Sequence, residues 1–410
     1  MKLKFSVILK SLALSVAVVA TCHGRTWTSS DGLRTFEGTL MAYDAERGLV
    51  MVKMNNGRTL RFSQDTLSAK DIEYLKTAKP GEPDTPPPAK ARPIPEVLPD
   101  YNGEKADTSK PVKVFILMGQ SNMVGFGSTS GLKAATEKGL YPYLVNDAGE
   151  WIIREDVRNV YFNNNGGGPG KLKFNNWLSG GNGSGAGSGK FGPEIGIGHY
   201  LGYALDEPVL LLKVCTGNRA LGWDLLPPSA EGTGNKGQSY QGNKDDPERK
   251  PIKDHPNGWY AGLQYDGDTY CAKNALKSIG DFYPGATKYE VAGFFWWQGA
   301  ADPGKGSVEH YETNLAHLIR DLRKDFNAPN AKFVCATMGH EKKTAPIAKA
   351  QLAVDGESGK YPEFKDNVAT FYSNPVSKGG SANGHYGGNA ETYLNVGAGM
   401  GRLMAELLAK

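Results

Sequence analysis

The chain has 410 residues, 22% of them charged and 39% hydrophobic, and its formal net charge is +4. This length suits one large domain with a smaller companion, and the residue balance is that of an ordinary globular protein. The small positive excess forms no basic stripe, which argues against a nucleic-acid partner.

Residues 1–24 have the features of an export signal. A start with two lysines precedes the short apolar run 11–20, and small residues follow, so we expect cleavage near Gly24 and a periplasmic or extracellular protein. The apolar run is too short to span a bilayer. An uncleaved anchor and lipidation of Cys22 are the alternatives.

Residues 25–78 predict a small β module. Stretches of alternating polarity are separated by turn signals at positions 47–48 (Arg-Gly) and 56–57 (Asn-Gly), and a short helix capped by Ser68 follows. The pattern resembles the Sla-type homology domain, an SH3-like β-barrel found fused to exported enzymes, which implies a docking or spacer role. Residues 79–110 are rich in proline and predict an extended linker.

Residues 111–410 predict one α/β domain. Continuous apolar runs, typical of buried parallel strands, alternate with stretches of helical periodicity. The predicted strands include 112–119, 208–215, 289–299 and 331–339, and the predicted helices include 308–326 and 391–408. This alternation predicts a doubly wound sheet with helices on both faces, whose ligands bind beyond the carboxyl ends of the strands.

Three cysteines lie in this domain. Cys215 and Cys335 end apolar runs and are expected to behave as small buried hydrophobic residues. With Cys271 they match no zinc or thiol-redox spacing, although one disulfide is possible in an oxidising compartment.

Ser121 is the first candidate for chemistry, in the run Gly119–Met123 (GQSNM) directly after a predicted strand. A serine at a strand-to-helix turn exposes its hydroxyl at the sheet edge, and the free N–H groups and dipole of the following helix favour an oxyanion nearby. Serine also caps helices. The local pattern alone leaves both roles open.

The run 115–125 (FILMGQSNMVG) resembles the first block of SGNH hydrolases, in particular the sialate O-acetylesterase and family-six carbohydrate esterase group. The resemblance implies that Ser121 is the acyl-accepting nucleophile, with its own N–H facing the oxyanion. It also implies a flavodoxin-like three-layer α/β/α sandwich with a parallel sheet.

Two later runs resemble further blocks of this group. Residues 191–196 (FGPEIG) imply that the Gly192 N–H donates to the oxyanion, unless the run is only a loop-to-helix turn. The preceding Gly- and Asn-rich stretch, 163–189, is expected to be a lid or a solvated insertion. Residues 296–302 (WWQGAAD) imply that Gln298 also donates to the oxyanion, unless its amide only ties loops together.

His385 is the candidate general base, in a loop before the last predicted helix where the family places its histidine. His340 is its rival. The family's acids are missing, because Ala300 and Ala382 stand at their positions. Either Asp302 orients His385, or a backbone carbonyl does so in a Ser–His dyad.

Four further side chains are predicted to contact the substrate: Gln120, Asn122, Arg219 and Trp297. Arg219 suits a surface ion pair equally well, and the tryptophan ring suits the core. No metal-ligand spacing and no phosphate or dinucleotide fingerprint is present, so the sequence predicts neither a metal nor a cofactor.

The sequence therefore predicts a serine esterase that removes O-acetyl groups from carbohydrate through an acetyl-enzyme intermediate, as the resemblance to sialate O-acetylesterases implies. An acetylxylan or other polysaccharide esterase is the nearest alternative. A carbohydrate-binding protein without activity is the alternative from another class, because the family's acids are lost.

Overall fold

The computed structural model describes residues 25–31, 34–45, 47–54, 58–76, 78, 94–166, 168–305 and 307–410. Its contacts divide the chain into two compact units, residues 1–91 and 92–410. The predicted export signal, the turn at 56–57 and residues 79–93 of the predicted linker lie outside the described residues.

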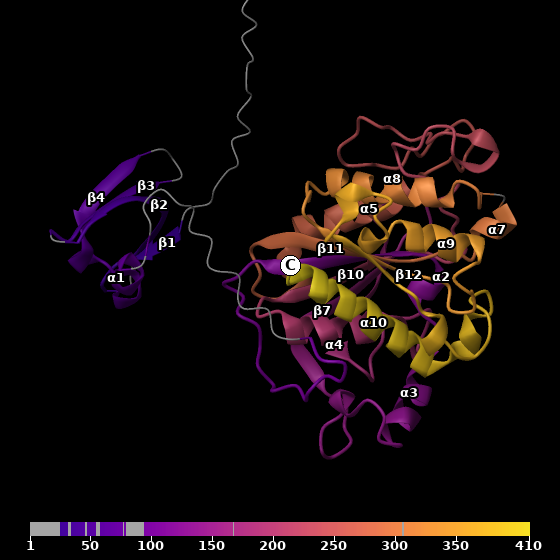
Figure 1. The fold of residues 1–410 in the computed structure, drawn as a ribbon, viewed down its shortest axis with the longest axis horizontal. Coiled ribbons are helices and arrows are strands. Elements are labelled where there is room, and N and C mark those ends of the chain that lie inside the picture. The colour runs from indigo at the N-terminus through magenta and orange to yellow at the C-terminus, as the bar shows by residue number, and fades with distance from the viewer. Residues whose placement is uncertain are drawn as a thin grey trace, which may run out of the picture. The chain divides into compact units, whose positions relative to one another are not determined.

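The smaller unit holds a four-stranded antiparallel sheet and one short α-helix (Figure 1). Its elements are β1 (Arg25–Thr28), β2 (Thr35–Asp44), β3 (Leu49–Met54), β4 (Thr59–Ser63), η1 (Gln64–Thr66) and α1 (Ala69–Leu75). Trp27 and Val52 are fully buried in its core, and the Ser68 side chain accepts from the Asp71 N–H as the predicted cap. The strands and helix agree with the sequence, while the SH3-like barrel stays a prediction.

The larger unit is built on a seven-stranded sheet of order β13-β12-β11-β5-β10-β7-β8. The strands are β5 (Val112–Gly119), β7 (Ile153–Asn163), β8 (Lys171–Ser179), β10 (Val209–Val214), β11 (Tyr289–Trp297), β12 (Lys332–Ala336) and β13 (Val368–Phe371). All neighbouring pairs are parallel except β7 and β8. The four strands predicted from apolar runs are confirmed as β5, β10, β11 and β12, and the sheet is mostly parallel as expected.

Helices cover both faces of this sheet. They are α2 (Ser121–Val124), α3 (Thr129–Thr136), α4 (Glu194–Ala204), α5 (Leu263–Lys277), α6 (Ile279–Phe282), α7 (Asp302–Lys305), α8 (Tyr311–Asp325), α9 (Pro346–Ala353) and α10 (Ala390–Leu408). The short pair β6 (Gly127–Ser128) and β9 (Lys190–Phe191) and several 3₁₀ turns connect them: η2 (Pro142–Leu144), η3 (Asn235–Gly237), η4 (Gly356–Ser358), η5 (Pro362–Phe364), η6 (Asn374–Val376) and η7 (His385–Gly388). Helices α4 and α10 lie on one side of the sheet and α5, α8 and α9 on the other (Figure 1).

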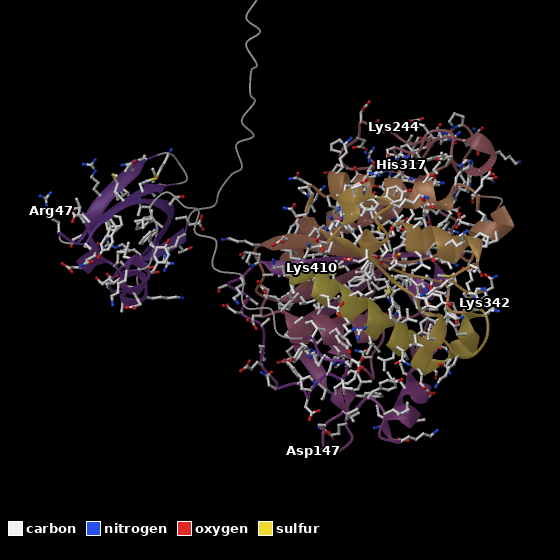
Figure 2. All side chains as sticks on the ribbon, in the orientation of Figure 1. Arg47, Asp147, Lys244, His317, Lys342 and Lys410 are labelled. Atoms are coloured by element: carbon white, nitrogen blue, oxygen red, sulfur yellow. The ribbon has the colours of Figure 1, made fainter. Side chains whose placement is uncertain are left out.

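Strand β5 supplies both cores because successive side chains of a strand point to opposite faces. Val114 and Ile116 pack with α5 and α8, whereas Phe115 and Leu117 pack with α4 and α10, and all four are fully buried. Burying a side chain of this kind stabilises a fold by about 1.5–3 kcal/mol. Charged side chains such as Asp147 and Lys342 lie at the outside (Figure 2).

The strand order places a crevice at the end of β5. The chain lays β7 and β10 on one side of β5 and then crosses to β11, β12 and β13 on the other. Loops therefore leave the carboxyl end of the sheet in opposite directions around β5, which is where doubly wound folds bind ligands. Ser121 lies two residues after the end of β5.

The cysteines behave as the sequence predicts. Cys215, Cys271 and Cys335 are free and buried, and burial raises the pKa of the Cys335 thiol to about 12. None of the helices described is both long and apolar enough to cross a membrane.

Candidate active site

The turn between β5 and α2 is fixed by close backbone packing. Gly119 has φ +145°, and a Cβ placed there would lie 2.5 Å from the Trp297 carbonyl oxygen. Gly125 has φ +102°, and its Cβ would lie 2.2 Å from the Gly192 Cα. Only glycine tolerates such approaches, so the two glycines hold Ser121 between the end of β11 and the residue that follows β9.

Ser121 opens onto a cavity of about 670 Å³. The other lining residues are Val124, Phe126, Thr129, Tyr161, Asn163, Lys173, Phe174, 181–189 and Gly217. Hydroxyl, amide and aromatic groups dominate this lining. Among the described residues it contains one basic side chain, Lys173, and no carboxylate. Such a set of groups suits a polyhydroxylated ligand whose rings stack on aromatic faces. The Gly- and Asn-rich stretch of the sequence thus forms β8 and a cavity wall.

Gly217 lies beside Ser121, a position that sequence analysis missed. A Cβ built on Gly217 would contact the Ser121 Cβ at 3.5 Å. Within the described part of the chain, neither the Gly217 N–H nor the Ser121 N–H has a hydrogen-bond partner. The available signal was topological, because Gly217 follows the end of β10 just as Ser121 follows the end of the neighbouring β5.

Gly192 is not free to hold an oxyanion, which corrects the prediction. Its N–H donates to both carboxylate oxygens of Glu194, at 3.0 Å each. A Cβ on Gly192 would lie 2.9 Å from the Met123 carbonyl oxygen. The physical role of this glycine is therefore close packing against the end of α2.

Gln298 is also occupied, which corrects its predicted place in the oxyanion hole. Its Nε2 donates to the Arg219 carbonyl oxygen at 2.8 Å and to Asp302 Oδ2 at 2.5 Å, so both amide protons are used. Its Oε1 accepts from the Tyr311 hydroxyl at 2.8 Å. The side chain is fully buried and joins the Arg219 loop to the first residues of α7 and α8.

Asp302 accepts from four donors, none of which is His385. Besides Gln298, these donors are the Leu221 and Gly222 N–H groups, at 3.1 and 3.0 Å, and the Ser307 hydroxyl, at 3.1 Å. Asp302 is fully buried, and burial raises the pKa of its carboxyl group. Its contacts assign it to holding the loop after β10, in place of the predicted role of orienting His385.

His385 lies in a half-buried loop at the carboxyl edge of the sheet, between β13 and α10. Its ring stacks on Phe126, with centroids 3.8 Å apart and planes 4° apart, and Phe126 lines the cavity that Ser121 opens onto. Burial lowers the pKa of the His385 imidazole, and no charged neighbour contributes to that shift. Among the described residues, His385 has no hydrogen bond to Ser121 and no carboxylate partner.

His340, the rival histidine, lies in the loop after β12. Its Nδ1 accepts from the Ala382 N–H at 3.2 Å, so it supports the loop that carries His385. The ring is exposed, and partial burial lowers its pKa. His340 does not line the cavity beside Ser121.

The predicted substrate contacts divide into two groups. Trp297 is fully buried, stacks on Tyr386 and donates to the Thr337 carbonyl oxygen, so the prediction that it binds sugar is wrong. Asn122 is equally buried, and its side chain contacts Met338 and Tyr393 in the core.

Gln120 and Arg219 hold the loops around the cavity. Gln120 is 3% exposed, and its Oε1 accepts from the N–H groups of Gly299 and Ala301. Arg219 is half-buried, with its guanidinium 4.7 Å from the Trp259 ring centroid and bonded to Gln264 and Asn165. Neither side chain lines the cavity.

In the part of the chain that the structure describes, no cluster of three or more His, Cys, Asp or Glu side chains is arranged to hold a metal ion.

Part of the larger unit matches a known family. Residues 264–377 match the model described as carbohydrate esterase, sialic acid-specific acetylesterase. This stretch includes Gln298, Asp302 and His340, whereas Ser121 and His385 lie outside it. The resemblance inferred from the sequence is thereby supported for the middle of the α/β unit. A search of the curated proteins finds no match.

Three solved structures are similar to the chain at low identity. A protein from Arabidopsis thaliana is 15% identical with a TM-score of 0.42, over 72% of this chain and 98% of that one. A carbohydrate acetylesterase from Xanthomonas citri is 14% identical with a TM-score of 0.39, over 85% of this chain and 58% of that one. NanS is 14% identical with a TM-score of 0.37, over 64% and 78%.

Proposed function

We propose that the protein is a serine esterase that removes O-acetyl groups from carbohydrate. One observation carries the proposal: Ser121 stands at the carboxyl end of the central parallel strand, opens onto a cavity of about 670 Å³ and touches the loop of Gly217. The match of residues 264–377 to carbohydrate esterases specific for sialic acid acetates supports the same activity.

In this proposal the Ser121 Oγ attacks the acetyl carbonyl carbon while the His385 imidazole takes the hydroxyl proton. The negative charge that develops on the carbonyl oxygen is held by the N–H groups of Ser121 and Gly217, which have no partner among the described residues. The bond from the acetyl carbon to the sugar oxygen then breaks, and His385 gives its proton to that oxygen. Water releases acetate from the acetyl-serine by the reverse sequence.

The proposed catalytic unit is a Ser–His dyad. Both oxygens of Asp302 are engaged by other donors, and Ala382 stands where the family carries an acid. In the structure the ring of Phe126 holds the His385 imidazole beside the cavity. For the reaction, the His385 side chain must turn from this stacked position toward Ser121.

The substrate is proposed to be an acetylated sugar that enters the cavity with its acetyl group at Ser121. Phe126, Phe174 and Tyr161 contribute aromatic groups to the lining, and Asn163 and the 181–189 wall contribute amide and hydroxyl groups. Export to the periplasm or the cell exterior remains part of the proposal, on the grounds of the N-terminal sequence.

The test compares the wild-type protein with Ser121→Ala on p-nitrophenyl acetate, acetylated sialic acid and acetylated xylan. We expect the wild type to release acetate and the variant to lose about 10⁶-fold in kcat, as removal of a serine nucleophile does elsewhere. Unchanged melting of the variant is the control for folding. Sugar binding without any acetate release by the wild type would instead establish a carbohydrate-binding protein.

A further inference from the structure

A fully buried ion pair lies beneath the wall of the cavity and the turn that carries Ser121. Lys213 on β10 and Glu194, the first residue of α4, are both 0% exposed, and the Lys213 Nζ lies 2.7 Å from Glu194 Oε2. Burying two charges costs free energy that the pair recovers only if the remaining hydrogen-bonding groups are also satisfied.

Lys213 and Glu194 form their remaining hydrogen bonds with two segments that border the proposed active site. The Lys213 ammonium also donates to the carbonyl oxygens of Val124 and Ser184, at 3.0 Å each. Its three protons therefore have three acceptors. Val124 is the last residue of the short helix that Ser121 begins, and Ser184 lines the cavity.

Glu194 completes the connection from the other side. Its carboxylate accepts from the Ser184 N–H at 3.0 Å and from the Gly192 N–H at 3.0 Å. Gly192 in turn packs against Gly125, where any Cβ would collide. The carboxylate also sits in the first turn of α4, where the helix dipole favours a negative charge.

We propose that Lys213 and Glu194 are positioning residues of the esterase: together they lock the helix that carries Ser121 to the wall of the cavity. The inference rests on the proposed function. Because one ammonium bonds both Val124 and Ser184, the nucleophile and the surface that holds the sugar keep a fixed separation. A displacement of about 1 Å at such a site costs about 100-fold in rate.

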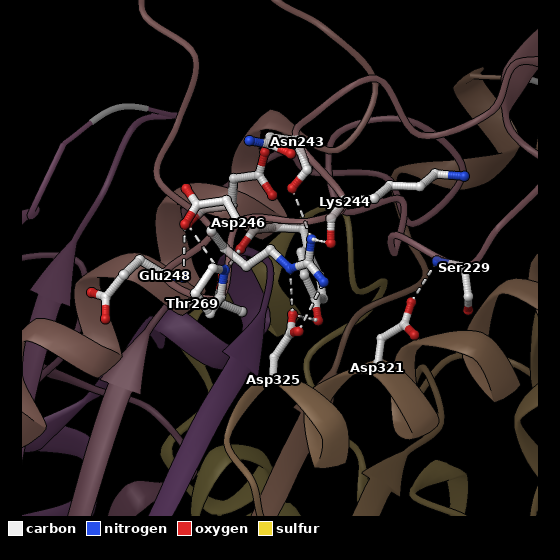
Figure 3. Close-up of polar contacts among 12 residues, drawn as sticks. Ser229, Asn243, Lys244, Asp246, Glu248, Thr269, Asp321 and Asp325 are labelled. Atoms are coloured by element: carbon white, nitrogen blue, oxygen red, sulfur yellow. Dashed lines mark hydrogen bonds and ion pairs between the residues drawn. The ribbon is translucent and has the colours of Figure 1, made fainter.

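The test uses the full-length double variant Lys213→Met/Glu194→Gln, which removes both charges at similar side-chain volume. Arg249→Met/Asp325→Asn is the matched control. That pair is also buried, 4% exposed on each side with Nε 2.9 Å from Oδ2, but it joins the 243–249 loop to the end of α8 (Figure 3). None of its atoms lines the cavity.

Three measurements separate positioning from stability: kcat and KM on p-nitrophenyl acetate, the rate at which a fluorophosphonate labels Ser121 by intact mass, and Tm by circular dichroism. We expect both double variants to melt earlier. Only Lys213→Met/Glu194→Gln should lose about 100-fold in kcat and in labelling rate, with KM changed far less. The control should stay within about 3-fold, as expected of a distant site.

Should the double variant not fold, Lys213→Met alone replaces it, because the Glu194 carboxyl group can take up a proton and its oxygen still accepts from the Gly192 and Ser184 N–H groups. A loss of about 10-fold or more in labelling rate supports the proposal. Wild-type activity together with unchanged kcat and labelling in the folded variant overturns it. A wild type that neither hydrolyses acetyl esters nor labels at Ser121 overturns the proposed function itself, and this inference with it.

Discussion

The two halves of the proposed catalytic unit are held in very different ways. The turn around Ser121 is buried, and Gly119 and Gly125 pack so closely against other backbone segments that no larger residue fits. Lys213 also donates a hydrogen bond to the last residue of α2, the helix that Ser121 begins. The loop around His385 is half-exposed, and its residues 385–388 all have positive φ between 52° and 75°. His385 itself is held mainly by the ring of Phe126.

This difference shows which half is pre-organised. The proposed nucleophile and the proposed N–H donors, at Ser121 and Gly217, closely follow the ends of β5 and β10, so we expect them to need no rearrangement before reaction. The proposed base, His385, lies on a strained loop, because left-handed backbone at residues other than glycine costs of order 1–3 kcal/mol each. We therefore expect the nucleophile turn to govern acyl transfer and the histidine loop to govern the proton transfer that accompanies it.

The largest expected effect in the histidine loop equals that of Ser121→Ala in the nucleophile turn. His385→Ala should lower kcat on an acetylated sugar by about 10⁶-fold, because serine without its base is a weak nucleophile. His340→Ala is the matched control and should change kcat by less than about 10-fold, since His340 only supports the loop. Steady-state kinetics measures kcat of both variants. If the two variants lose kcat equally, His385 is not singled out as the base.

The next largest effect is expected on the nucleophile turn. Gly217→Pro removes the N–H beside Ser121 and should lower kcat by about 10²–10³-fold, as loss of one oxyanion donor does in comparable sites. Gly217→Ala keeps the N–H, and its Cβ would meet Ser121 at an ordinary 3.5 Å contact, so it is the control. If the two variants are equally active in acetate release, the Gly217 N–H does not hold the oxyanion.

A smaller effect, on the pH dependence of kcat/KM, tests the role of Phe126. Burial lowers the pKa of His385, and the base acts as neutral imidazole, so kcat/KM should fall with decreasing pH through a midpoint below about 6.5. Phe126→Ala exposes the His385 imidazole ring to water. This change should raise the midpoint toward about 6.5 and lower kcat about 10-fold. A pH profile of each protein measures both changes, and an unmoved midpoint would deny Phe126 any influence on the histidine.

The smallest effect on activity is expected at Asp302. Asp302→Asn leaves an amide that cannot accept from all four donors, so the free energy of unfolding should fall by about 1–3 kcal/mol. Because Asp302 does not contact His385, kcat of the folded variant should fall less than about 10-fold, far below the about 10⁴-fold loss seen when a triad acid is replaced. Denaturation measures the change in the free energy of unfolding and steady-state kinetics measures the change in kcat, both on the same sample. A loss of kcat near about 10⁴-fold would restore Asp302 as the third catalytic member.

Sequence analysis located most of the larger fold because its signals are local. Four of the parallel strands are continuous apolar runs buried on both faces, and periodicity alone identifies them. Strand β7 was missed because charged residues interrupt its apolar pattern, as at Arg154 and Asp156, which bond to one another within the fold. The short strand β13 offers only four residues, too few for a pattern to stand out.

What the sequence determined by itself was the place of Ser121 at a strand-to-helix turn, because the apolar run of β5 and the Gly-Gln-Ser-Asn residues that end it are local patterns. Only the tertiary structure decided which polar groups are free. Gln298 and Asp302 find partners in a distant segment, the loop after β10, and Gly192 bonds the nearby Glu194. Among the described residues, the Gly217 N–H beside Ser121 has no partner. A hydrogen-bonding group has few bonds to give, and whether they are already used depends on neighbours that folding alone supplies.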